Sequence, residues 1–287
     1  MFFIVFLTAL GIMHGYVGWK IFSDLDLNST YAFIAIILVI ILTLLPVLPI
    51  LFRYIGYESS LLDKLSFIGY TSLGFFTLSF LAFISKDLII KSWGFISSFF
   101  PVGVNQQAPL NIEKREFLQK SLSIGILTLI GPTTAYGFYS ARKGPSIIDQ
   151  TIFLKNLPDS FENFTIAQIS DLHVGPTIKK PYVEKVLNQI SNINPDLIAI
   201  TGDMVDGSID YLKKDLEPLS QMIANYGTYF VTGNHEYYSG AERWLDETDR
   251  MGFTNLVNEN NLITINDQNI VLAGVTDFRA HQIIPSH

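Results

Sequence analysis

Three short clusters of carboxylate, imidazole and amide side chains stand out in the second half of the chain. They read DLHVG from Asp171, GDMVD from Gly202 and GNHEYY from Gly233. Asp203 follows Asp171 by 32 residues, and Asn234 follows Asp203 by 31 residues. Oxygen donors mixed with imidazoles suit Mn, Fe, Zn or similar ions. Two such ions about 3.5–4 Å apart clamp a phosphate group and activate water for attack on it. The residue types therefore indicate metal-assisted hydrolysis, provided that the clusters meet.

The sequence around the clusters predicts elements that bring them together. Each cluster directly follows a short apolar run, at residues 164–170, 196–201 and 228–232, and helical periodicity returns between these runs. Carboxyl ends of neighbouring parallel strands converge on one crevice of an α/β sheet. The expected helices are residues 180–192, 209–225 and 241–251, and further strands are expected at residues 151–157, 262–265 and 270–273.

In this order and after these strands, the three clusters resemble the first three signature blocks of calcineurin-like metallophosphoesterases. The resemblance implies an α/β domain, a two-sheet sandwich flanked by helices, which holds two divalent metal ions. It implies that Asp171 and His173 bind one ion and that Asp203 bridges both. Asn234 would bind the second ion through its side-chain oxygen. His235 would lie beside the phosphate, as proton donor to the leaving group or as stabiliser of the transition state.

The neighbouring residues have more ordinary interpretations. The Asp-containing clusters also fit helix N-caps, since Asp caps helices readily, but caps explain three clusters in register poorly. We expect Asp206 to support the loop rather than bind metal, and Glu236 to be equally free to face solvent. Glycines 175, 202 and 233 are expected to allow close backbone approach or positive φ.

The sequence departs from the family pattern after the third cluster. The family continues with a histidine after a later strand and a Gly-His-x-His block, and residues 271–277 resemble the strand and turn that precede them. His281 and His287 do not lie in that setting, and we interpret them as loop histidines. We therefore expect an incomplete sandwich, a weakened second metal site, low or absent activity, and a longer parent protein.

The first half of the chain has a different character. Hydrophobic residues make up 49% of the whole sequence and charged residues 16%, and the long apolar runs lie within residues 1–141. A helix of about 20 apolar residues crosses a bilayer. We expect four membrane spans, then a linker at residues 142–150 and the metallophosphoesterase domain at residues 151–287, the spans lying near residues 2–22, 31–52, 65–84 and 122–139.

Alternatives remain for two of these spans. The first also resembles a signal peptide, although it lacks a positively charged start, and the fourth also fits a buried core helix. His14 lies in the first apolar run, where we expect it to pack rather than to bind a ligand.

Basic residues near the span ends predict the orientation. The positive-inside rule places Lys20 and the segment from Lys86 to Lys120 in the cytoplasm. Lys114-Arg115 before the fourth run resembles a twin-arginine export signal, and equally fits a basic helix start at the membrane interface. Both interpretations place the domain outside the cytoplasm, and the resemblance is closest to bacterial proteins anchored in the cytoplasmic membrane.

Charge and composition limit the function classes. The formal net charge of −7 argues against a nucleic-acid binder, and the absence of cysteine excludes thiol catalysis and disulfides. The leading hypothesis is hydrolysis of a phosphodiester, a pyrophosphate or a phosphomonoester, with an envelope lipid or a nucleotide as the substrate. The alternatives are a transporter or sensor that only binds a ligand, and a pseudoenzyme with one structural metal ion. Metal content separates them, since two ions favour hydrolysis, one the pseudoenzyme and none the binding module.

Overall fold

The computed structural model describes residues 2–25, 29–99, 112–284 and 286–287. The chain folds into two compact units. The first comprises residues 1–55 and 61–141, and the second comprises residues 56–60 and 142–287. Each unit has its own hydrophobic core.

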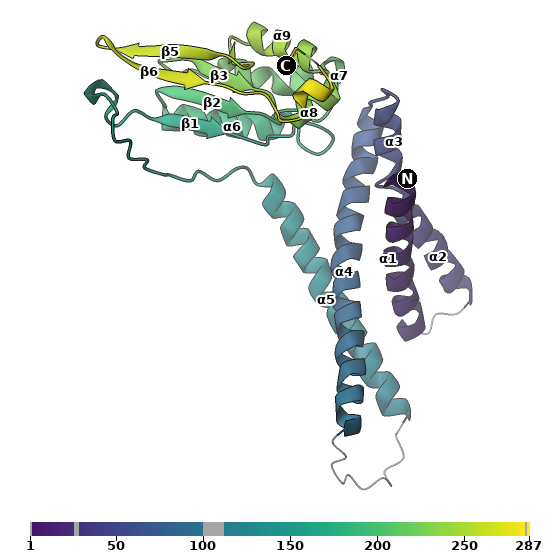
Figure 1. Cartoon of the computed structure of the whole chain (residues 1–287). Coiled ribbons are helices and arrows are strands. Elements are labelled where there is room, and N and C mark those ends of the chain that lie inside the picture. The colour runs from purple at the N-terminus through teal and green to yellow at the C-terminus, as the bar shows by residue number, and fades with distance from the viewer. Residues whose placement is uncertain (1, 26–28, 100–111, 285) are drawn as a thin grey trace. The chain divides into compact units, whose positions relative to one another are not determined.

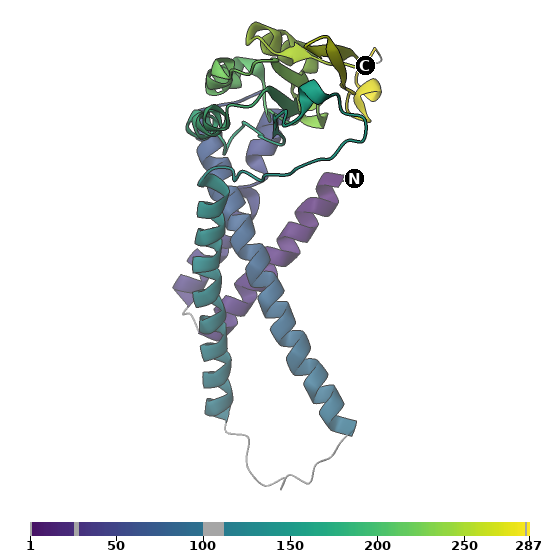
Figure 2. The same ribbon diagram turned by 90° about the vertical axis from the view of Figure 1, so that its left-hand side faces the viewer.

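Among the described residues, the first unit contains the apolar helices α1 (Phe2–Leu25), α2 (Ser29–Leu44), α3 (Leu48–Tyr54), α4 (Ser60–Phe99) and α5 (Ile112–Arg142). Figures 1 and 2 show α4 and α5 as long rods. The interruption between α2 and α3 falls at Pro46, which has no N–H for a helical hydrogen bond. The helix that contains the predicted span 65–84 is longer than that span, so Lys86 and Lys91 lie in α4 and not in a connection between the third and fourth spans.

Four stretches within these helices are long and apolar enough to cross a membrane, Ile4–Ser23, Ser29–Tyr54, Ser60–Ile96 and Glu116–Arg142. Ionisable groups inside such helices are costly unless they are paired. The Nζ of Lys20 lies 2.6 Å from Asp87 Oδ2, which also accepts a hydrogen bond from the Tyr16 hydroxyl at 2.8 Å. His14 is fully buried against the ring of Phe76, with centroids 4.1 Å apart, so it packs as expected.

The second unit is an α/β domain. Its four parallel strands are hydrogen-bonded in the order β1-β2-β3-β4, and β5 and β6 form a separate antiparallel hairpin. Its strands are β1 (Ile166–Ile169), β2 (Leu197–Thr201), β3 (Thr228–Val231), β4 (Thr254–Asn255), β5 (Asn260–Ile265) and β6 (Gln268–Ala273). Its helices are α6 (Lys180–Ile193), α7 (Ile209–Leu216), α8 (Asn234–Ser239) and α9 (Ala241–Arg250), with 3-10 turns η1 (Asp159–Phe161), η2 (Glu217–Gln221) and η3 (Ala280–Gln282).

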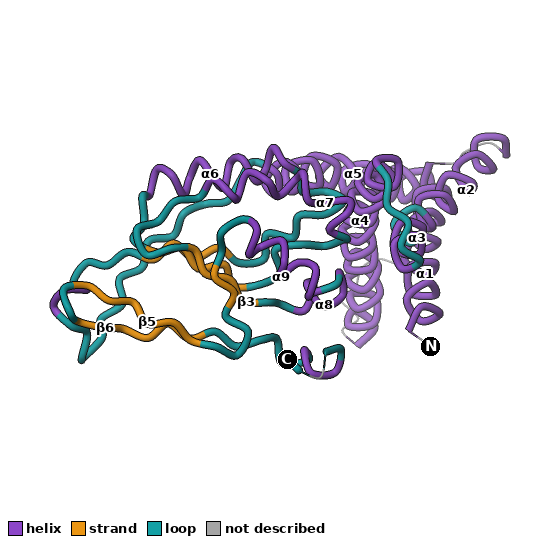
Figure 3. The backbone as a smooth tube through the Cα atoms, turned by 90° about the horizontal axis from the view of Figure 1, so that it is seen from above, coloured by secondary structure: helices purple, strands orange, loops and turns teal. Residues whose placement is uncertain are grey.

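The sheet is buried on both faces, as parallel sheets usually are. Side chains of β2 alternate between the faces: Ile198 and Ile200 pack in the core that includes α6, α7 and α9. Leu197 packs in a second core with Ile263 of the hairpin. Figures 1 and 3 show the sheet between α6 and the β5–β6 hairpin. The α/β layering expected from the sequence is therefore confirmed.

Two predicted elements are wrong. Residues 151–157 form no strand, and Ile152 and Phe153 are largely exposed, because an extended apolar segment becomes a strand only when another strand pairs with it. The helix predicted for residues 209–225 ends at Leu216, and a 3-10 turn follows. Pro218 stops the α-helix there, since it lacks the N–H that the next turn needs.

Candidate metal centre

The loops after β1 and β2 and the start of α8, which follows β3, bring three of the predicted site residues together. Ligand atoms of His173, Asp203 and His235 all lie within 4.8 Å of one another. His173 Nε2 is 3.6 Å from Asp171 Oδ1 and 3.9 Å from Asp203 Oδ2. The rings of His173 and His235 meet edge to face, with centroids 4.5 Å apart. Asp171 thus joins the cluster through His173.

Asn234 is the first residue of α8. Its neighbours in sequence both contact Asp203. The backbone of Gly233 packs directly on Asp203, and the N–H of His235 donates a hydrogen bond to Asp203 Oδ1. The structure thus places Asn234 next in sequence to two residues that contact Asp203. His281 lies in η3, and His287 Nδ1 is 3.0 Å from the hydroxyl of Tyr237.

The backbone of the cluster is unusual. Asp171, His173 and Asp203 have φ of 54°, 46° and 51°, in the left-handed region. Non-glycine residues enter this region at a cost, which Asp, Asn and His tolerate best. Residues held in such conformations concentrate at functional sites, where the surrounding structure enforces them. Three of the predicted ligands therefore share a left-handed backbone conformation. The surrounding sequence did not predict this conformation.

Backbone hydrogen bonds extend the sheet pairing into the loops. The N–H of His173 donates to Asp203 O at 2.9 Å, and the N–H of Val174 donates to Met204 O at 2.9 Å. The N–H of Asp171 donates to Gly202 O at 3.3 Å. The first two loops therefore form a paired ribbon rather than independent connections.

The second and third loops touch through glycines. A Cβ at Gly202 would lie 2.5 Å from Gly233 N and 2.7 Å from Gly233 Cα, and φ of Gly202 is +80°. Gly233 has φ of −98°, so it serves close approach and not positive φ. Gly175 likewise faces Asp206, whose Cβ and O would lie 3.0 Å from an added Cβ.

Glu236 is fully buried, so the expectation that it was equally free to face solvent is wrong. Its carboxylate accepts hydrogen bonds from backbone N–H groups of the second and third loops. Burial raises the pKa of the Glu236 carboxyl, while these N–H donors act in the opposite direction. Its role was missed because the residues that it contacts lie 31 to 33 positions earlier, apart from Gly233.

His235 is held by two carboxylates. Its backbone N–H donates to Asp203 Oδ1 at 2.9 Å, and its ring Nδ1 lies 3.3 Å from Asp206 Oδ1. Because Nδ1 faces Asp206, Nε2 is the ring nitrogen left to exchange a proton with another group. Asp206 accordingly contacts the imidazole directly, while its expected support of the loop stays a prediction.

The donor set fits a divalent cation. Asp171 and Asp203 contribute carboxylates and His173 contributes an imidazole, and hard oxygen donors with imidazoles suit transition-metal ions. Within the described residues, no lysine or arginine forms an ion pair with Asp171, Asp203 or Asp206. Their negative charge is thus not neutralised by a basic side chain, as expected where a metal ion supplies the positive charge.

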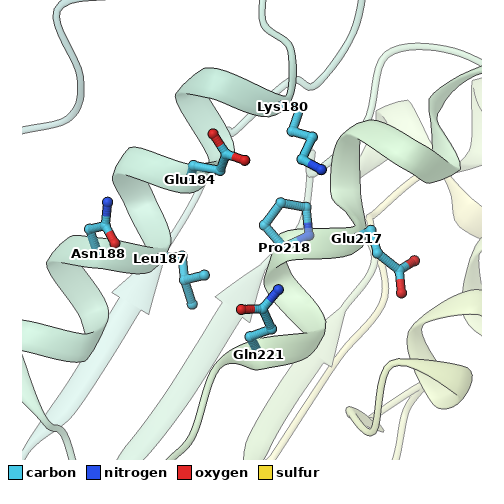
Figure 4. Close-up of a pocket in the computed structure, with 7 residues that line it drawn as sticks. All are labelled: Lys180, Glu184, Leu187, Asn188, Glu217, Pro218 and Gln221. Atoms are coloured by element: carbon cyan, nitrogen blue, oxygen red, sulfur yellow. The ribbon is translucent and has the colours of Figure 1, made fainter.

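A hollow of about 280 Å³ lies elsewhere, between α6 and η2 (Figure 4). None of its lining residues belongs to the metal-ligand cluster. The lining residues are Lys180, Glu184, Leu187, Asn188, Glu217, Pro218 and Gln221. We assign it no part in the chemistry.

Comparison with known proteins identifies the domain. Residues 164–282 match the family model described as calcineurin-like phosphoesterase. A zebrafish (Danio rerio) protein named transmembrane protein with metallophosphoesterase domain is 31% identical, over 60% of this chain and 40% of its own length. An uncharacterized metallophosphoesterase of Helicobacter pylori is 32% identical, over 71% of this chain and 52% of its own.

The name of a more distant relative includes a substrate. The UDP-2,3-diacylglucosamine pyrophosphatase of Chlamydia trachomatis is 25% identical, over 44% of this chain and 40% of its own length. No solved structure gives a significant match. The matched part of the chain corresponds to about a third to a half of the length of these curated relatives. Residues 164–282 of this chain, with the clustered aspartates and histidines at the strand ends, form a calcineurin-like metallophosphoesterase domain.

Proposed function

We propose that this domain hydrolyses phosphate esters with two bound divalent metal ions, in a protein anchored to a membrane by its apolar helices. The observation that carries the proposal is the convergence within 4.8 Å of His173 and Asp203, from the loops after β1 and β2, and His235, at the start of α8. The match to the calcineurin-like phosphoesterase family supports it.

We propose the following roles. Asp171 and His173 hold one ion, Asp203 bridges both ions, and Asn234 holds the second. Bound divalent cations supply Lewis acidity toward the phosphoryl oxygens and acidify water. Asp203 is suited to bridging because the N–H of His235 fixes Oδ1, while Oδ2 faces His173.

His235 is proposed to donate a proton to the leaving group. Its Nδ1 contacts Asp206 Oδ1, which sets the ring orientation. Its Nε2 then transfers the proton, and an imidazole suits this role because its usual pKa lies near neutrality. Removing such a group typically costs a factor of about 10²–10⁴ in rate.

The proposed substrate class is a lipid-linked or nucleotide-linked pyrophosphate or phosphodiester. The name of the Chlamydia trachomatis relative supports this class, and a membrane anchor favours substrates that lie in or near the bilayer. The distribution of basic residues supports an orientation with the domain outside the cytoplasm, and we propose a bacterial cytoplasmic membrane as its location. Since the chain has no cysteine, a Glu242→Cys variant on the exposed side of α9 tests this orientation with a membrane-impermeant maleimide on intact cells. Labelling only after lysis would contradict it.

Metal binding is the primary test, since the sequence predicts a low rate of hydrolysis. The full chain in detergent is titrated calorimetrically with Mn²⁺, and hydrolysis of bis(p-nitrophenyl) phosphate is then followed at high protein concentration. Asp203→Asn should abolish binding of the ions. His235→Gln should leave the first ion bound and slow hydrolysis about 100-fold or more.

The matched control is Asp210→Asn, which removes a carboxylate paired with Arg243 on the surface at 2.7 Å. It should change neither reading. Wild-type protein that binds no Mn²⁺ would overturn the metal site. Two bound ions with no hydrolysis under any condition would overturn the catalytic proposal and favour the ligand-binding or pseudoenzyme alternative.

A further inference from the structure

Glu236 is a fully buried carboxylate between the second and third loops. Both of its oxygens accept backbone hydrogen bonds. Oε1 accepts from Met204 N at 2.8 Å and from Val205 N at 3.3 Å. Oε2 accepts from Asp203 N at 2.9 Å and from Gly233 N at 2.7 Å. Four N–H groups from two loops therefore converge on one side chain.

These bonds account for the acceptor capacity of the carboxylate. An ionised carboxylate offers about four lone-pair sites, and four backbone donors use them. Glu236 therefore has no free oxygen to offer to a metal ion, although it lies within two residues of Asn234. Its contacts are with the main chain that carries the ligands and not with the ligand atoms.

The two loops exchange hydrogen bonds reciprocally. The N–H of Asp203 donates to Glu236, while Asp203 Oδ1 accepts from the N–H of His235 at 2.9 Å. Each carboxylate thereby holds the loop that bears the other. The backbone of Asp203 and one of its two oxygens are both fixed, which leaves Oδ2 facing His173 at 3.9 Å.

We propose that Glu236 is a positioning residue that holds Asp203 and the start of α8 in the geometry needed to bind metal. The inference rests on the proposed function of Asp203 as a ligand. It predicts that both carboxylate oxygens are required as acceptors, because only acceptors satisfy four converging N–H groups. In Glu236→Gln the amide NH₂ would face two backbone N–H groups as a third donor, and the loop would shift.

A matched control distinguishes positioning from the general effect of losing a buried acid. Glu247 on α9 is 4% exposed and pairs with Lys213 at 2.9 Å and Arg250 at 2.6 Å. Its partners are side chains of α7 and α9 and include none of the proposed metal ligands. Glu247→Gln therefore removes a buried carboxylate charge from the same domain without touching the second or third loop.

The experiment has two readouts on the full chain in detergent. Hydrogen exchange of the amides of residues 203–205 is measured without metal, and Mn²⁺ affinity is measured by calorimetry. Glu236→Gln should accelerate this exchange at least tenfold and weaken Mn²⁺ binding at least tenfold. Glu247→Gln should leave Mn²⁺ affinity within twofold of wild type, and should accelerate the exchange by no more than its loss of global stability accounts for.

Several outcomes would overturn the inference. Exchange or Mn²⁺ affinity of Glu236→Gln within twofold of wild type would do so. Glu236→Asp, which keeps the charge but is one methylene shorter, covers the case in which Glu236→Gln does not fold. It should bind Mn²⁺ with an affinity between those of wild type and Glu236→Gln, and wild-type affinity would count against the proposal. If wild-type protein binds no Mn²⁺, the proposed function fails, while the exchange comparison still decides whether Glu236 holds the loop.

Discussion

Gly202 offers a sharp test of how closely the second and third loops approach. It has φ of +80°, and a Cβ there would lie 2.5 Å and 2.7 Å from the N and Cα atoms of Gly233. Both are backbone atoms, so no side chain can rotate away to make room. In Gly202→Ala the loops must separate, or the strand ends must shift.

The cost has two parts. An L-residue in the left-handed region costs about 1–2 kcal/mol. Forcing an extra methyl into a packed site costs about 1–3 kcal/mol more. The two parts add up to about 2–5 kcal/mol before the unfolded state is considered, a large share of a typical domain stability of about 5–15 kcal/mol. Alanine also lowers the entropy of the unfolded chain, which offsets about 0.4–1 kcal/mol.

Gly252→Ala is the matched control. Gly252 follows α9 with φ of +87°, and nothing lies within 4 Å of an added Cβ. It shares the conformational cost and the unfolded-state term with Gly202→Ala but has no steric conflict. The difference between the variants isolates the steric part, and we expect Gly202→Ala to be the less stable by about 1–3 kcal/mol.

Tryptophan fluorescence provides the assay. Trp244 is fully buried in the domain, whereas Trp19 and Trp93 lie in the apolar helices of the first unit. A Trp19→Phe, Trp93→Phe background therefore reports urea unfolding of the domain through Trp244. A stability difference between the two alanine variants below about 0.5 kcal/mol, within the scatter of neutral substitutions, would refute the close approach of the loops.

Two further predictions concern charge. Asp171→Asn should leave the stability of the metal-free protein within about 0.5 kcal/mol of wild type. It should reduce the stabilisation by Mn²⁺, which for a bound ion reaches about 2.7 kcal/mol at a hundredfold excess over Kd. Equal shifts of the unfolding temperature by Mn²⁺ in the variant and in wild type would contradict this prediction. Glu247→Gln should cost about 1–3 kcal/mol at neutral pH and should flatten the acid limb of a stability profile measured by urea unfolding. Burial alone would raise the pKa of Glu247, but hydrogen bonds and charge attraction from Arg250 and Lys213 lower it from 4.5. Its contribution is therefore present above about pH 4.5 and lost below it as the carboxyl protonates, and an unchanged acid limb would refute this.

Much of the domain was predictable from local patterns. Apolar runs of five to seven residues followed by amphipathic stretches predicted β1, β2, β3 and α6 close to their observed bounds, because strand and helix periodicity is a local property. The short helix α8 was missed, since GNHEYY has no apolar periodicity. The strand expected at residues 151–157 failed for the opposite reason, because its pattern is adequate but strand formation depends on a partner elsewhere.

For the metal centre, the amino-acid sequence by itself determined which donor types follow each strand, and chain order alone placed Asp171, Asp203 and His235 at strand ends. Only the tertiary structure decided how these groups are held. The left-handed backbone at Asp171 and Asp203 and the burial of Glu236 depend on pairing between loops about 30 residues apart. Such contacts leave no periodic trace in the sequence, since their geometry depends on the packed sheet that brings the loops together.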